Sequence, residues 1–169
     1  RHLGVTEKDK VIGILSVKDF ANYFHNKYNQ ETDEKGEIQY FMQNTIVNIE
    51  SYETVLTAAQ KMADKKVGAL LVTEMGKAKG ILSDSAITMD IIAQGANVST
   101  SKVSSILNRE LITIDHSQSM HDAYQLMRGN NVRQLFITRG KKIAGMLSIK
   151  DFANYYNFKF CKQINDEDR

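Results

Sequence analysis

The chain has 169 residues, of which 42% are hydrophobic and 25% are charged, and its formal net charge is +2. These proportions are typical of globular proteins and exclude disordered and collagen-like chains. The apolar runs are far shorter than the roughly 20 residues that cross a bilayer, and a single cysteine, Cys161, cannot form an intramolecular disulfide. We therefore expect a cytoplasmic protein with no membrane segment, and since the sequence begins at Arg1, we expect a piece of a longer chain.

Internal repeats organise the sequence. Residues 1–24 align without a gap with residues 133–156, and 13 of these 24 positions are identical. Residues 42–86 align in the same way with residues 107–151. Each copy carries a glycine at the same position, namely Gly13, Gly80 and Gly145. The chain thus reads as half a repeat followed by two whole repeats.

The repeats predict four parts along the chain. They are the second half of a preceding repeat (1–30), a middle domain (38–98), a last domain (101–160) and a polar tail (161–169). The polar stretch from His25 to Glu37 is expected to be a linker.

The middle repeat predicts the order strand, helix, strand, strand, helix. The strands are expected at 45–49, 67–73 and 79–83, and the turn between the last two at 74–77. Thr54 is the expected N-cap of the first helix, because apolar residues follow it at helical spacing. The second helix is expected from about Asp84 to Gln94, with Gly95 as its stop.

The last repeat predicts the same order. Its strands are expected at 111–114, 132–138 and 143–148, with a turn at 139–142. Ser119 is expected to cap the first helix together with Asp122, three residues on. The second helix is expected from about Lys150.

This order, with GKAKGILSDSAI closing the middle repeat and GKKIAGMLSIKDF closing the last, resembles the cystathionine-β-synthase (CBS) domain family. The openings FMQNTIVNIESYETVLTAAQKMADKKVGALLV and ILNRELITIDHSQSMHDAYQLMRGNNVRQLFI are also similar to that family. The resemblance implies a mixed α/β fold, with tandem CBS domains packed as a pseudo-twofold pair. It also implies clefts that hold adenosine-containing ligands, and further association into dimers.

A binding site is predicted at the end of the last repeat's third strand. Ser148 and the free NH groups of the following helix start suit phosphate oxygens. Asp151, about one helical turn on, can accept hydrogen bonds from ribose hydroxyls. The resemblance implies these same two roles, phosphate for the hydroxyl and ribose for the carboxylate. Helix capping is the competing interpretation of this pair.

The resemblance also implies how the rest of the ligand is held. The adenine would lie between Ile112 and Thr113 on one side and Val132 on the other. Arg133 either reaches the phosphate tail or is a solvated surface cation, and Lys150 is a further ligand-binding candidate. The ligand would be AMP, ADP, ATP or S-adenosylmethionine.

The other two copies of the site depart from this pattern. In the middle repeat Ser83 keeps the hydroxyl, but Ala86 replaces the aspartate, so we expect a weak or empty site. The half repeat keeps Ser16 and Asp19 but lacks its first strand and helix, so its site is incomplete unless other residues supply them. The two clefts of the pair are therefore expected to be unequal.

Three functions remain open, and no catalytic motif or metal-ligand cluster is found. The first is a non-catalytic regulatory module that senses an adenosine ligand. The second is an RNA-binding protein that holds a terminal adenosine in the same pocket and meets backbone phosphates with Lys65, Lys66, Arg128, Arg133, Lys141 and Lys142. The third is a dimerisation scaffold, a homodimer with vestigial clefts. Aromatic residues spaced along the two homologous helices, among them Phe152, Tyr155, Tyr156, Phe158 and Phe160, are expected in the core or in a dimer contact.

Overall fold

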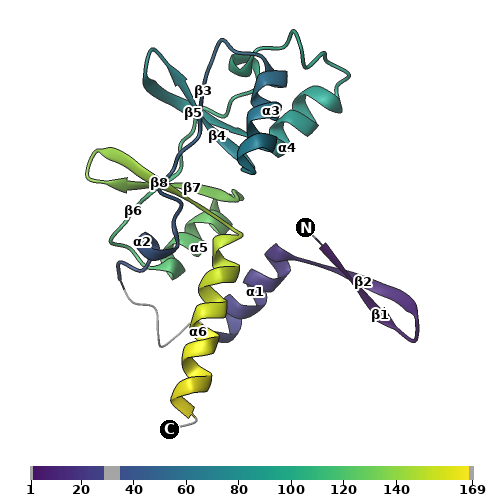
Figure 1. Cartoon of the computed structure of the whole chain (residues 1–169), viewed down its shortest axis with the longest axis vertical. Helices are drawn as coiled ribbons and strands as arrows, with labels where there is room; N and C mark the ends of the chain where they lie inside the picture. The colour runs from purple at the N-terminus through teal and green to yellow at the C-terminus, as the bar shows by residue number, and fades with distance from the viewer. Residues whose placement is uncertain (1, 29–34, 168–169) are drawn as a thin grey trace. The chain divides into compact units, whose positions relative to one another are not determined.

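The computed structural model describes the backbone of residues 2–28 and 35–167 and the side chains of residues 2–27 and 35–159. The chain forms two compact units of mixed α and β structure (Figure 1). One unit contains residues 1–44 and 113–169, and the other contains residues 45–112.

The unit of residues 45–112 contains a three-stranded sheet. Strand β3 (Asn48–Glu50) pairs in parallel with β4 (Ala69–Glu74), which pairs antiparallel with β5 (Lys77–Ser83). Helix α3 (Val55–Lys65) lies between β3 and β4 in the sequence and buries Val55, Ala58 and Met62. The predicted cap is confirmed, because the Thr54 side chain accepts a hydrogen bond from Thr57 N at 3.1 Å.

The second helix of this unit differs from the single α-helix that the sequence predicts. An α-turn, α4 (Asp84–Ala86), continues as a π-helix, η1 (Ile87–Ile92), and Ala93 N donates to Thr88 O at 2.9 Å. The wider turn still buries Ile87 and Ile91 in the core. A short 3₁₀ helix, η2 (Val103–Ser105), follows later in the chain.

The last repeat forms a sheet of the same order. Strand β6 (Thr113–Asp115) is parallel to β7 (Gln134–Arg139), and β7 is antiparallel to β8 (Lys142–Ser148). Helix α5 (Met120–Gly129) begins with the predicted capping box of Ser119 and Asp122. Helix α6 (Asp151–Glu167) continues through most of the segment predicted as a polar tail.

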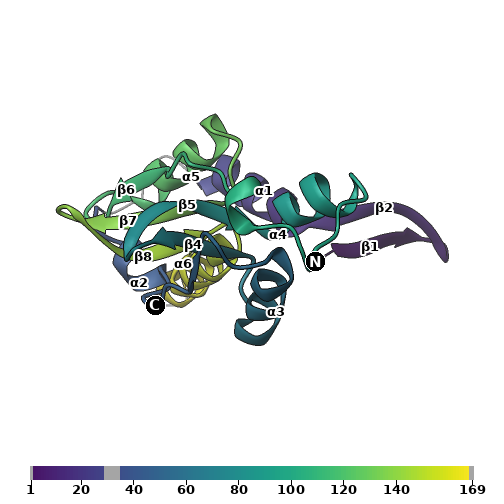
Figure 2. The same ribbon diagram turned by 90° about the horizontal axis from the view of Figure 1, so that it is seen from above.

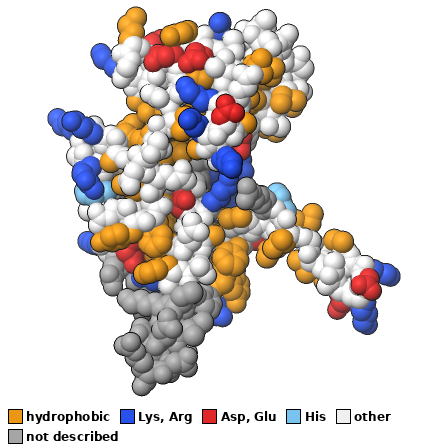
Figure 3. All heavy atoms as spheres, viewed as in Figure 1, with side chains coloured by type: hydrophobic (Ala, Val, Ile, Leu, Met, Phe, Trp, Pro, Cys, Tyr) orange, Lys and Arg blue, Asp and Glu red, His pale blue; other side chains and the backbone are white. Residues whose placement is uncertain are grey.

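The half repeat is a hairpin followed by a helix. Strand β1 (His2–Glu7) pairs antiparallel with β2 (Lys10–Ser16), and α1 (Val17–Tyr28) packs against α6. The hairpin extends away from α1 in both ribbon views (Figures 1 and 2). Hydrophobic side chains are visible along it (Figure 3), and most of the large ones are exposed: Leu3, Val5, Val11, Ile12, Ile14 and Leu15.

The predicted linker from His25 to Glu37 is wrong at both ends. Helix α1 includes His25, whose ring is buried and stacks on Tyr124 with centroids 4.0 Å apart. Glu37 is also buried, and it precedes a short helix, α2 (Ile38–Phe41). Polar residues suggested a solvated segment, but these two have partners on the last repeat. Residues 29–34 of the predicted linker lie outside the described part of the chain.

The sheets of the two whole repeats exchange the segments that precede them in the sequence. Gln43, at the start of the middle repeat, pairs with Met146 of β8 through hydrogen bonds of 2.8 and 2.9 Å. Asn108, near the start of the last repeat, pairs with Ile81 of β5 through hydrogen bonds of 2.8 and 2.9 Å. The spatial units therefore do not follow the linear order of the repeats, and each sheet gains a strand-like edge from a distant segment.

The aromatic residues of α6 are divided between core and surface. Phe152, Tyr155 and Tyr156 are buried, whereas Phe158 is 55% exposed. Phe160 lies outside the described side chains. None of the helices in the described part of the chain is long and apolar enough to cross a membrane.

Candidate functional site

The predicted site residues of the last repeat meet at one end of its sheet. In the antiparallel pair, Gln134 at the start of β7 is opposite Ser148 at the end of β8. Ile149 N donates to Arg133 O at 2.9 Å, so the segment before β7 lies beside the start of α6. Thr113, the first residue of β6, pairs with Phe136, two residues into β7. Strand pairing thus gathers residues that are far apart in the sequence.

Ser148 and Asp151 are in direct contact. Asp151 Oδ2 accepts hydrogen bonds from Ser148 N and Ser148 Oγ, both at 2.7 Å. Ser148 is 9% exposed and Asp151 is 7% exposed. A carboxylate this buried needs hydrogen-bond partners, and Ser148 provides two of them.

The second oxygen of Asp151 is less well occupied. Gln43 Nε2 lies 3.5 Å from Asp151 Oδ1, at the long limit of a hydrogen bond. Because an ionised carboxylate offers about four lone-pair sites, Oδ1 has capacity for further donors. Gln43 comes from the exchanged segment at the start of the middle repeat, 108 residues away in sequence, and its contact with Asp151 was not predicted.

The same Ser-x-x-Asp hydrogen bonds occur at two other helix starts. Ser16 N and Oγ donate to Asp19 Oδ2 at 2.8 and 2.5 Å, and this carboxylate is exposed. Ser119 N and Oγ donate to Asp122 Oδ2 at 3.2 and 2.8 Å. Helix capping therefore accounts for this local geometry wherever the motif occurs. What distinguishes Asp151 is its burial beside β7 and Gln43.

The middle repeat lacks the carboxylate, as the sequence predicts. Ser83 Oγ caps α4 by accepting from Ala86 N at 3.2 Å and lies 3.0 Å from Ser85 Oγ. Ala86 supplies no side-chain acceptor in place of the aspartate. The Ser83 position therefore offers only a hydroxyl to a ligand.

The remaining predicted residues differ in exposure. Thr113, Arg133 and Lys150 are exposed, whereas Val132 and Ile112 are half-buried. Ile112 is the last residue of the unit of residues 45–112 and directly precedes Thr113 in the sequence. Val132 and Arg133 also line a pocket together with residues of α1 and α5.

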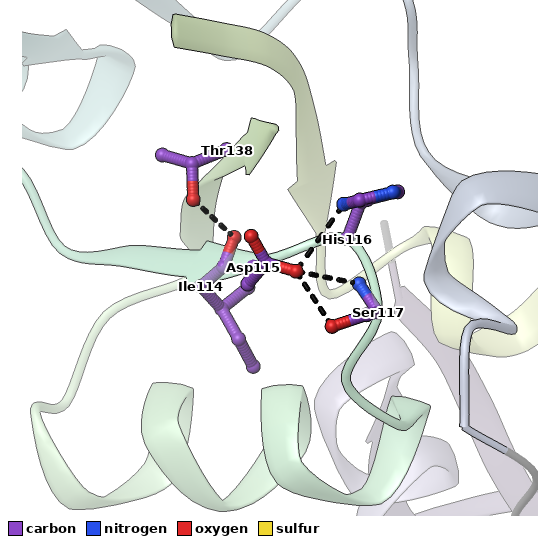
Figure 4. A network of polar contacts seen from close by, with 5 residues as sticks. All are labelled: Ile114, Asp115, His116, Ser117 and Thr138. Atoms are coloured by element: carbon purple, nitrogen blue, oxygen red, sulfur yellow. Dashed lines mark hydrogen bonds and ion pairs between the residues drawn. The ribbon is translucent and has the colours of Figure 1, made fainter. Parts of the chain in front are cut away.

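A polar network holds the turn between β6 and α5 (Figure 4). Asp115 Oδ1 accepts from Ser117 Oγ at 2.6 Å and from Ser117 N at 3.0 Å, and His116 Nδ1 lies 3.2 Å away. The Ser117 hydroxyl, followed by its backbone NH, lowers the pKa of Asp115 from its usual 3.8. Thr138 Oγ1 donates to Ile114 O at 3.3 Å. These bonds stabilise the loop that follows Thr113.

The cations proposed for RNA backbone contacts are all exposed. Lys65 and Lys66 belong to the unit of residues 45–112, and the other four belong to the other unit. Strand β7 separates Arg133 from the turn that carries Lys141 and Lys142. Within the described residues, no group of His, Cys, Asp or Glu side chains could hold a metal ion.

The fold and this strand-to-helix site define a tandem-repeat protein of small α/β domains. The chain matches the CBS domain over residues 36–92 and 103–157. It therefore belongs to the CBS domain family, and the resemblance in the repeats is confirmed.

Relatives support this assignment. The CBS domain-containing protein YhcV of Bacillus subtilis is 32% identical over 112 residues, which are 66% of this chain and 79% of YhcV. The mitochondrial CBS domain-containing protein CBSX3 of Arabidopsis thaliana is 34% identical over 59% of this chain, and the match spans half of its own length, 50%. A solved protein with CBS domains from Burkholderia ambifaria is 27% identical with a TM-score of 0.64, over 66% of this chain and 82% of its own.

Proposed function

We propose that this chain is a non-catalytic regulatory module that binds an adenine nucleotide or a related adenosyl compound at its last repeat. One observation carries the proposal. Asp151 is a buried carboxylate with one oxygen fixed by Ser148, and among the described residues the other oxygen, Oδ1, has a single long hydrogen bond, 3.5 Å from Gln43 Nε2. Membership of the CBS domain family supports a regulatory role for the chain.

The chemistry follows from the donors and acceptors at this end of the sheet. Asp151 Oδ1 accepts hydrogen bonds from the paired hydroxyls of a ribose, and such charge-assisted bonds contribute about 1.5–3 kcal/mol each. Lys150 and Arg133 are exposed cations at the same strand ends, and they neutralise a phosphate. Val132 supplies apolar contact for the adenine.

Regulation requires that the ligand bind one arrangement of the chain better than another. Gln43 can transmit the effect of the ligand, because it connects the segment at the start of the middle repeat to both β8 and Asp151. A ribose on Asp151 Oδ1 replaces the long contact from Gln43 Nε2. The ligand thereby acts on the exchanged segment.

The test is a calorimetric titration of the chain with AMP, ADP, ATP, S-adenosylmethionine and adenosine. Asp151→Asn keeps the size of the side chain and removes the charge, and it should weaken binding at least tenfold. Asp19→Asn is the matched control, because Asp19 at the start of α1 makes the same contacts with Ser16 while its carboxylate is exposed. Binding that survives Asp151→Asn, or no binding by any of the five compounds, would contradict the proposal.

Self-association is a second candidate function, carried by a different observation. The β1–β2 hairpin exposes six large apolar side chains, among them Leu3 and Ile14, each 70% exposed. Contiguous apolar surface of this kind is typical of interfaces. A dimer by sedimentation equilibrium that Ile14→Lys dissociates would support the homodimer expected from the family, and a monomer at high concentration would refute it.

A further inference from the structure

A pocket lies between α1 and the end of α5, and Ile149, next to Ser148, is also among its lining residues. Lys18 and Asn22 of α1 form one wall. Tyr124 and Arg128 of α5, with Asn131 and Arg133 after it, form the opposite wall. The half repeat and the last repeat therefore build this pocket jointly, within one compact unit.

The charged residues that line this pocket are all basic. Lys18, Arg128 and Arg133 line it, and none of its lining residues is acidic. Asp19, next to Lys18 in the sequence, has its carboxylate bound by Ser16 N and Oγ at 2.8 and 2.5 Å. Among the described residues, none of the three cations is in a salt bridge. Three like charges around one pocket repel each other unless an anion lies between them.

The polar groups of the pocket are already oriented. The Tyr124 hydroxyl donates to Asn22 Oδ1, which connects α5 to α1. Burial raises the pKa of Tyr124 above its usual 10.0, and the positive charge of Arg128 opposes this shift. The guanidinium of Arg128 thus acts on the Tyr124 hydroxyl that lines the pocket. Asn131 adopts a left-handed backbone conformation, with φ of 52°, where α5 ends.

The size of the pocket selects the group that fits. Its volume is about 60 Å³, and one water requires roughly 10–15 Å³ on the same measure. The space therefore suits a group of about five heavy atoms, which is far smaller than a nucleoside. Arginine side chains bind phosphate oxygens with paired NH donors.

We infer that this pocket binds a phosphate group, which bridges Lys18 of α1 to Arg128 and Arg133 of the last repeat. The phosphate is either a free ion or the end of a nucleotide, and the chemistry of recognition is the same. Its binding holds α1 against α5 and so couples the half repeat to the last repeat. The pocket shares Val132 and Arg133 with the adenosine site proposed at Asp151, so for a nucleotide's phosphate this inference rests on the proposed function.

The test is a titration of the full chain with inorganic phosphate and with AMP, followed by calorimetry and by amide hydrogen exchange of α1. Saturable binding of either compound should slow exchange in α1. Lys18→Met and Arg128→Met should each weaken the binding of the compound about five- to tenfold. Arg139→Met, which removes an exposed arginine at the other end of β7, is the matched control and should leave binding unchanged.

The variants also separate the two sources and the two proposals. Phosphate binding that is lost in Arg128→Met and kept in Asp151→Asn supports a site for the free ion. AMP binding that requires Arg128, with no binding of inorganic phosphate, supports a nucleotide's phosphate. Binding by neither compound, or equal binding by Arg128→Met and Arg139→Met, would overturn the inference whatever Asp151→Asn does.

Discussion

Gly145 of β8 and Gln43 of the exchanged segment lie so close that no side chain fits between them. A Cβ on Gly145 would be 2.8 Å from the Gln43 carbonyl oxygen and 2.9 Å from Met42 Sδ. Gly80 has the same relationship to Asn108 in the other unit, where a Cβ would clash with the Asn108 carbonyl oxygen. Gly13, in the half repeat, has open space around the corresponding position.

Gly145→Ala should therefore destabilise the protein by about 1–3 kcal/mol, because the added methyl group forces the Gln43 backbone away from β8. Gly80→Ala should do the same to the pairing of Asn108. The matched control is Gly13→Ala, which should change stability by less than about 0.5 kcal/mol. Urea unfolding measures all three, and equal effects at Gly13 and Gly145 would contradict this account.

These glycines mark how far the sequence predicts the fold. Their regular spacing revealed the repeats. The helical spacing of apolar residues and the N-cap residues predicted the helices that follow Thr54 and Ser119. The close approach of a distant segment could not be predicted, because Gln43 and Met146 carry no local signal of their pairing. The π-helix at Ile87–Ile92 was also missed, since its apolar residues have α-helical spacing.

The candidate site likewise contains contacts that the sequence predicts and contacts that it does not. The contact of Ser148 with Asp151 was predictable, because three residues along a helix start form a local motif. The long contact from Gln43 and the pocket beside Lys18 were not, since tertiary packing alone unites those residues. The ligand-binding roles of Ser148, Lys150, Asp151, Thr113, Val132 and Arg133 stay predictions.

Glu37 should be important for the stability of the unit of residues 1–44 and 113–169. Its Oε1 lies 2.6 Å from Lys159 Nζ and its Oε2 accepts from Tyr155 OH at 3.1 Å, while its side chain is only 11% exposed. Glu37→Ala should lower the free energy of unfolding by about 1–3 kcal/mol, because it removes the carboxylate that accepts from the Tyr155 hydroxyl and pairs with Lys159 in a buried place. Glu110→Ala, at an exposed position, is the control, and an equal loss there would rule out this role.

Asp115 should make stability depend on pH in the acid range. The Ser117 hydroxyl holds the pKa of Asp115 below 3.8 in the folded chain. A carboxyl with a lowered folded pKa contributes stability that is present above 3.8 and is lost as the pH falls through the folded value.

Ser117→Ala should raise the pKa of Asp115 toward 3.8, as followed by NMR of its carboxyl carbon. His116→Gln should raise it less, because the charge of His116 is a smaller cause than the Ser117 bonds. A larger shift in His116→Gln than in Ser117→Ala would invert the assigned order of causes.

The hydrogen bond from Tyr124 to Asn22 should control how firmly α1 is held. Burial raises the pKa of Tyr124 above 10.0, so its contribution to stability is complete below that pH and is lost as the pH rises through the folded value. The absorbance titration of the chain minus that of Tyr124→Phe should give a midpoint above 10.0. Asn22→Ala should lower that midpoint and speed hydrogen exchange in α1, since water reaches the hydroxyl once its acceptor is gone. Tyr52→Phe, at a position that is 68% exposed, is the control and should leave exchange unchanged. A Tyr124 midpoint no higher than that of Tyr52 would show that the Tyr124 hydroxyl is solvated and that other contacts hold α1.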